Sequence, residues 1–169
     1  MLHPAAAHFA ISLPLISLVL GLLYLFKPSE MMSKISTRFL VFAAIFVVVA
    51  YFTGKNDAGI VINTLSTFDY VSPPSLLGEH AKLGQYLAIT MVVVALIKMF
   101  GCFKKMYKIE LFAIILLAVL SAGILSQGKI GGELTYEHGL NVAKHAQMQN
   151  VAAEAAEMGD DEDDEEEEE

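Results

Sequence analysis

The chain has 169 residues, of which 55% are hydrophobic and 18% charged, and its formal net charge is -8. Ten of its nineteen acidic residues lie at 160–169, so the negative charge belongs to the tail and the remainder is slightly basic. The apolar content excludes an ordinary soluble globular domain. The single cysteine, Cys102, excludes a disulfide framework, a zinc–cysteine cluster and covalent haem attachment through a CxxCH motif.

Four apolar stretches follow one another along the chain, at about residues 5–26, 39–52, 83–100 and 111–125. A helix needs about 20 apolar residues to cross a bilayer core, and none of these stretches has a persistent polar stripe. The first stretch begins near Met1 but lacks the basic residues and cleavage site of a secretory signal. We therefore predict an all-α, integral membrane four-helix bundle. With fewer than two charged residues inside the spans and no broken helix, the pattern argues against a secondary transporter.

Basic residues near the span ends predict the orientation of the bundle. Two loops, the one between the first and second spans and the one between the third and fourth, carry seven basic residues in or beside them: Lys27, Lys34, Arg38, Lys98, Lys104, Lys105 and Lys108. The segments on the opposite side carry four. Loops rich in Lys and Arg stay in the cytoplasm. We therefore predict a protein of the bacterial cytoplasmic (inner) membrane with both termini on the periplasmic side, N-out and C-out.

Three segments outside the spans have their own composition. A long connection at about 54–78 carries apolar residues and is predicted to lie over the outer mouth of the bundle. The division predicted is a transmembrane domain at 1–142, an outward-facing helical extension at 143–158 and a disordered acidic tail at 159–169. The tail is either simply solvated or attracts cations or a basic periplasmic electron carrier.

The histidines all fall on the predicted outer side. His3 and His8 open the first span, His80 opens the third, and His138 follows the fourth, with His145 farther along the tail. Two carboxylates reach the same depth, Asp57 after the second span and Glu133 after the fourth. Ionisable groups in a membrane bundle usually face its interior and pair with each other, an ion or a cofactor. The pattern therefore predicts a polar site at the outer mouth.

The leading hypothesis is a b-type haem that transfers electrons near the outer surface. His8 and His80 lie on different helices within about one turn of the boundary, so they could be the two axial ligands. Small residues beside them leave room for a flat macrocycle: Ala5, Ala6, Ala7, Ala81, Gly84 and Ala88.

Other interpretations stay open. A divalent metal or a proton relay would use some of six side chains: His3, His8, Asp57, His80, Glu133 and His138. The histidines could also simply hydrogen-bond at the interface, or the chain could be a structural subunit of a larger membrane complex. We see no paired nucleophile and base for hydrolysis and no phosphate-binding loop, so an enzyme is disfavoured. Topology accounts for the basic patches, so the expected partner is the lipid bilayer and not nucleic acid.

Four segments resemble a known bacterial membrane family, domain of unknown function 2231. They are His3-Pro4-Ala5-Ala6-Ala7-His8-Phe9, Gly54 to Asp57, His80-Ala81-Lys82-Leu83-Gly84 and Gly131-Gly132-Glu133-Leu134-Thr135-Tyr136-Glu137-His138-Gly139. The resemblance covers about residues 2–142 and implies a four-span module with polar positions at these motifs. One departure is Ala10, where the family favours proline, with Pro14 about a turn later. The resemblance implies no reaction.

Overall fold

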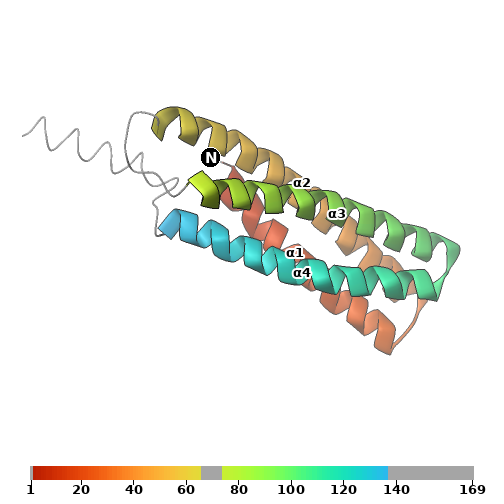
Figure 1. Ribbon diagram of the computed structural model, residues 1–169. Coiled ribbons are helices and arrows are strands. Elements are labelled where there is room, and N and C mark those ends of the chain that lie inside the picture. Colours follow the sequence, from red (N-terminus) through yellow and green to blue (C-terminus); the bar gives the residue numbers. More distant parts are fainter. Residues whose placement is uncertain (1, 66–73, 137–169) are drawn as a thin grey trace, which may run out of the picture.

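The computed structural model describes residues 2–65 and 74–136, with side chains from 2 to 59 and from 76 to 136. This part of the chain forms four helices: α1 (His3–Phe26), α2 (Glu30–Leu65), α3 (Pro74–Lys104) and α4 (Tyr107–Tyr136). They run alternately up and down as one elongated bundle (Figure 1). All four are long and apolar enough to cross a membrane. The predicted all-α, four-span architecture is confirmed.

The helices join through short turns at one end of the bundle. Ser29 caps α2, since its Oγ accepts a hydrogen bond from Met32 N at 3.2 Å. Between α3 and α4 the chain reverses at Lys105, whose φ of 54° lies in the left-handed region. Met106 N then donates to Gly101 O at 2.8 Å, which satisfies a carbonyl left open at the end of α3.

The two ends of the bundle differ in what they carry. The α1–α2 and α3–α4 turns share one end, which we name the turn end (Figure 1). The starts of α1 and α3 and the last turns of α2 and α4 lie at the opposite end, which we name the terminal end. Each helix packs against two neighbours, in the ring order α1–α2–α3–α4, and the described helices make no diagonal backbone contact.

The middle of the bundle is a dry apolar core. Its buried residues come from all four helices: Ala10, Leu40, Ala44, Val47, Met91, Val94, Ala113, Leu117 and Leu120. Large apolar side chains also cover the outside, among them Val19, Phe42, Ile89 and Val119, each more than half exposed. A soluble helix would carry polar residues there, so this outer surface suits lipid.

The helices are longer than the apolar stretches that predicted them. At 30 residues, the α2 span from Glu30 to Gly59 reaches about 45 Å, beyond the roughly 30 Å core of a bilayer. The predicted connection at 54–78 is wrong at both ends, because α2 continues to Leu65 and α3 already begins at Pro74. Gly54 and Gly131-Gly132, which belong to the segments that resemble the family, lie inside α2 and α4. At two of these glycines, Gly54 and Gly131, a histidine ring occupies the space that a side chain would take.

Candidate functional site

His3, at the start of α1, faces the bundle at the terminal end. Its Nδ1 lies 2.9 Å from Ala50 O of α2, and since a carbonyl only accepts, Nδ1 must carry the proton. Thr53 Oγ1 lies 3.5 Å from the same nitrogen. The ring rests against Gly54, where a methyl group would stand 2.7 Å from Cε1 of His3. The His3 ring therefore fits against α2 because Gly54 has no side chain.

His80, near the start of α3, is the second histidine of this end. Its ring packs on Gly131 of α4, where a methyl group would stand 3.1 Å from Cε1. Gln127 of α4 donates from Nε2 to His80 O at 2.9 Å, which orients the amide. The two helices are thus joined beside a half-buried imidazole.

Three buried polar atoms at the terminal end have no hydrogen-bond partner within the described residues. They are Asp57 Oδ2 from α2, His80 Nδ1 from α3 and Gln127 Oε1 from α4. Buried polar atoms are nearly always paired, because an unpaired one costs about 1–3 kcal/mol. The carboxylate and amide oxygens are acceptors, and a neutral imidazole offers one more. Among the described residues, the two oxygens have no donor or cation.

The other predicted residues are placed differently. His8 is exposed on α1, and its Nδ1 lies 2.6 Å from Pro4 O of its own helix. The structure therefore does not bring His8 to the buried ring of His80. Glu133 is half-buried in the last turns of α4, and His138 lies outside the described residues, as do the predicted helical extension and acidic tail. Within 2–59 and 76–136, no three His, Cys, Asp or Glu side chains are grouped closely enough to hold a metal ion.

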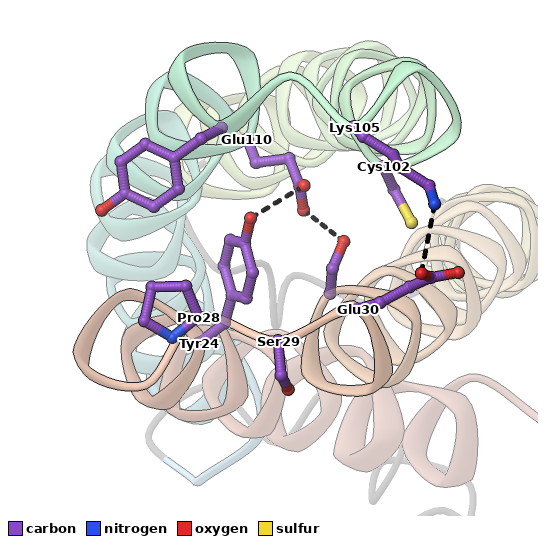
Figure 2. Close-up of a pocket in the computed structure, with 9 residues that line it drawn as sticks. Tyr24, Pro28, Ser29, Glu30, Cys102, Lys105 and Glu110 are labelled. Carbon is purple, nitrogen blue, oxygen red and sulfur yellow. Dashed lines mark hydrogen bonds and ion pairs between the residues drawn. The ribbon is translucent and has the colours of Figure 1, made fainter.

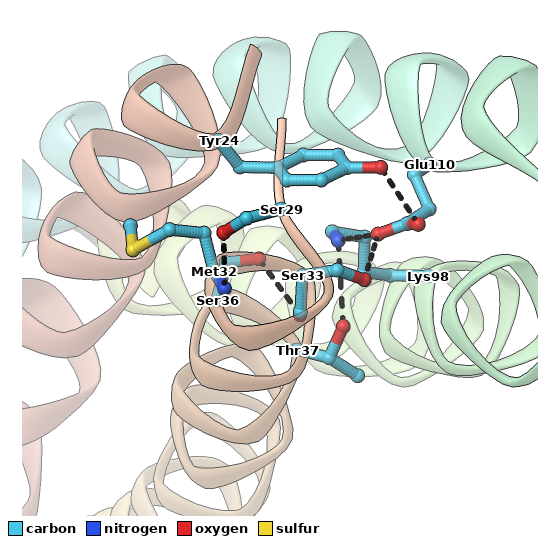
Figure 3. Close-up of polar contacts among 8 residues, drawn as sticks. All are labelled: Tyr24, Ser29, Met32, Ser33, Ser36, Thr37, Lys98 and Glu110. Carbon is cyan, nitrogen blue, oxygen red and sulfur yellow. Dashed lines mark hydrogen bonds and ion pairs between the residues drawn. The ribbon is translucent and has the colours of Figure 1, made fainter. Parts of the chain in front are cut away.

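A second polar cluster lies at the turn end, and we name it the turn-end cluster: Tyr24, Ser33, Thr37, Lys98 and Glu110. Glu110 is 2% exposed and accepts from Tyr24 Oη at 3.0 Å and from Ser33 Oγ at 2.7 Å. It also forms a buried ion pair with Lys98 (Figure 3). Lys98 Nζ donates to Thr37 Oγ1 at 3.3 Å and lies 4.8 Å from the centre of the Tyr24 ring. All four helices contribute.

The sequence did not lead us to predict this cluster. The prediction of fewer than two charged residues inside the spans is wrong, because Lys98 and Glu110 are both buried in the bundle. Lys98 was interpreted as one of the basic residues that flank the spans and set their orientation, yet it is only 1% exposed. A signal was present, because Glu110 is the single acidic residue between Glu79 and Glu133. An isolated carboxylate near an apolar span needs a cation, and Lys98 stands on the neighbouring span.

The two polar regions lie about one bilayer thickness apart. Lys98 follows His80 on the same face of α3 by about five helical turns, which is about 27 Å. Between them this face carries the buried residues Ala88, Met91, Val94 and Ala95. Polar groups thus occupy each end of the bundle interior, and an apolar layer separates them.

The fold and these clusters define an integral membrane four-helix bundle with a buried polar region at each end. The chain belongs to the family described as predicted membrane protein DUF2231, whose family model matches residues 1–144. No curated protein matches the chain. No solved structure matches it either.

Proposed function

We propose that the protein is a cation-handling membrane module whose terminal end binds a proton, or a divalent metal ion around which His3, Asp57 and His80 close from the wider spacing they have in this structure. The observation that carries the proposal is that three buried atoms on three different helices, Asp57 Oδ2, His80 Nδ1 and Gln127 Oε1, have no partner among the described residues. Asp57 Oδ2 and Gln127 Oε1 are acceptors, and with the His80 proton on Nε2 its Nδ1 is an acceptor too, so that none of the three can satisfy another. A bound cation would satisfy them together, as ionisable groups inside membrane bundles commonly do.

The hydrogen bond of His3 supports the same proposal. Histidine ligands of metal ions usually donate their other ring N–H to a carbonyl or carboxylate, which fixes the tautomer. His3 has this arrangement already, because Nδ1 donates to Ala50 O. Its Nε2 is therefore an acceptor without further change. Gly54 and Gly131 support the two rings from α2 and α4.

The b-type haem hypothesis, with electron transfer to a periplasmic carrier, remains a prediction with less support. It needs His8 and His80 on opposite sides of one macrocycle. His8 is exposed and bonded within its own helix, whereas His80 is half-buried. A metal ion or proton requires no movement of His8, and this favours the cation-handling proposal.

Zinc binding by the purified full chain tests the proposal. We expect wild type to bind about one Zn²⁺ in calorimetry, with an affinity that falls in acid because the imidazoles must be unprotonated. His80→Ala should lose this binding. His8→Ala is the matched control, a histidine of the same end whose loss should leave zinc binding unchanged.

Other outcomes separate the competing functions. A Soret band in protein from haem-replete cells, lost in both His80→Ala and His8→Ala, would establish the haem hypothesis instead. If neither zinc nor pH distinguishes His80→Ala from wild type, the cation-handling proposal is overturned. A structural subunit of a larger membrane complex would then explain the fold.

We also propose that the terminal end faces the periplasm in a bacterial inner membrane. Six exposed basic residues support this, all at the turn end: Lys27, Lys34, Arg38, Lys104, Lys105 and Lys108. A cysteine at exposed Ser29, in a Cys102→Ser background, tests it. An impermeant maleimide should label Ser29→Cys only in opened cells, and labelling in intact spheroplasts would reverse the orientation.

A further inference from the structure

The turn end holds a pocket that the proposed function does not use. It has a volume of about 290 Å³ and opens between the α1–α2 turn and the start of α4 (Figure 2). Glu110 and Ser33 lie at its buried base, Tyr24 and Tyr107 form one side, and Glu30 and Lys105 stand at its exposed rim. Small-molecule sites start at about this volume and combine apolar walls with a few convergent polar groups.

The chemistry of the lining favours a cation. Glu110 and Glu30 are carboxylates, and the rings of Tyr24 and Tyr107 lie 6.0 Å apart at an angle of 49°. Carboxylates and aromatic faces both attract ammonium groups. Both carboxylates already have lysine partners, Glu110 with Lys98 and Glu30 with Lys34 and Lys105. A cation is therefore favoured by the remaining acceptor positions and the tyrosine faces and not by a net negative charge.

The protein already binds an ammonium group with the same side chains. Lys98 Nζ is paired with Glu110 and stands over the ring of Tyr24. The carboxylate keeps capacity for one more donor, because Oε2 accepts from Ser33 and Lys98 whereas Oε1 accepts from Tyr24 alone. Each carboxylate oxygen has two acceptor positions, so a ligand N–H can bind at Oε1.

We propose that this pocket binds a small primary amine in its protonated form. The ammonium group donates to Glu110 Oε1, and its methylene groups lie against the two tyrosine rings. Glu30 at the rim, which is paired with Lys34 and Lys105, adds a second carboxylate acceptor. Since liquid water occupies about 30 Å³ per molecule, the pocket corresponds to roughly ten waters, enough for an amine of four or five carbons.

Calorimetry with butylammonium on the full chain in detergent tests the proposal. Wild type should bind butylammonium more tightly than tetramethylammonium, which has no N–H, and more tightly than butyrate. Tyr107→Leu should weaken butylammonium binding by about 2- to 5-fold, the range of a partly exposed cation–π contact. Glu30→Gln should weaken it by a similar factor.

Two exposed residues outside the pocket give matched controls. Tyr86→Leu removes a ring from the outer face of α3, and Glu79→Gln removes a carboxylate at the terminal end. Both should bind butylammonium as wild type does. Equal binding of tetramethylammonium, tighter binding of butyrate, or an unchanged affinity in both Tyr107→Leu and Glu30→Gln would overturn the proposal. His80→Ala should leave amine binding unchanged, so this test is independent of the cation site.

Discussion

The two ends of this bundle use buried polar groups in opposite ways. At the turn end, Glu110 has three donors and Lys98 has a carboxylate, a hydroxyl and an aromatic ring. At the terminal end, Asp57, His80 and Gln127 each keep a buried atom without a partner in the part of the chain that the structure describes. Buried polar groups that are fully paired hold helices in register, whereas unpaired ones have capacity for a ligand. The comparison therefore assigns a structural role to the Lys98–Glu110 ion pair of the turn end, beside the proposed amine pocket, and cation binding to the unpaired groups of the terminal end.

Breaking the ion pair at the turn end should have the largest effect. Lys98→Met leaves the Glu110 carboxylate buried without its cation, which costs about 3–5 kcal/mol of unfolding free energy. The midpoint of thermal unfolding in detergent, followed by helical circular dichroism, measures this. Lys34→Met removes an exposed lysine from the same end and should change little. A Lys98→Met protein as stable as Lys34→Met would refute the structural assignment.

Removing one neutral donor from the same carboxylate should cost less. Tyr24→Phe keeps the ring near Lys98 but deletes the hydroxyl that donates to Glu110 Oε1. Hydrogen bonds to charged groups contribute about 1.5–3 kcal/mol, so the unfolding midpoint should fall by less than in Lys98→Met. Tyr86→Phe, on the exposed face of α3, is the control. Equal stability of the two phenylalanine variants would contradict this contribution.

Glycine substitutions in α2 should distinguish packing from helix propensity at the terminal end. Gly54→Ala places a methyl group against the His3 ring, and overpacking of this kind costs about 1–3 kcal/mol, partly offset by better helix propensity. Gly59→Ala meets no atom within 4 Å and should gain up to about 1 kcal/mol. Zinc affinity should fall in Gly54→Ala alone. The same stability change in both variants would show that the His3 ring is not held by Gly54.

Removing the charge of Asp57 at the terminal end should have the smallest effect on stability, and any change should be a gain and not a loss. Asp57→Asn neutralises a half-buried carboxylate whose buried Oδ2 has no partner among the described residues, so the metal-free protein should be equally stable or gain up to about 1 kcal/mol. Zinc should then stabilise wild type but not Asp57→Asn. A clear loss of stability in metal-free Asp57→Asn would show that this end, too, is structural.

Residue types and spacing predicted the terminal end better than the turn end. His3, Asp57 and His80 are polar residues beside apolar spans, and the sequence places them at one depth. Which of His3 and His8 faces inward was not predictable from their spacing, because only the packing of α1 against α2 sets the helix rotation. Lys98 was not recognised as a buried charge, because its place near the end of a span already explained it as an orientation signal. Its partner Glu110 lies on another helix.

The four spans and their alternating direction follow from the sequence by itself, because a bilayer requires long apolar helices and short turns force neighbours to be antiparallel. Tertiary structure alone decided which polar groups are paired. Pairing depends on distances of a few ångströms between side chains on different helices, and Tyr24, Ser33, Lys98 and Glu110 meet only once all four helices are packed. The same packing leaves Asp57, His80 and Gln127 with unpaired buried atoms.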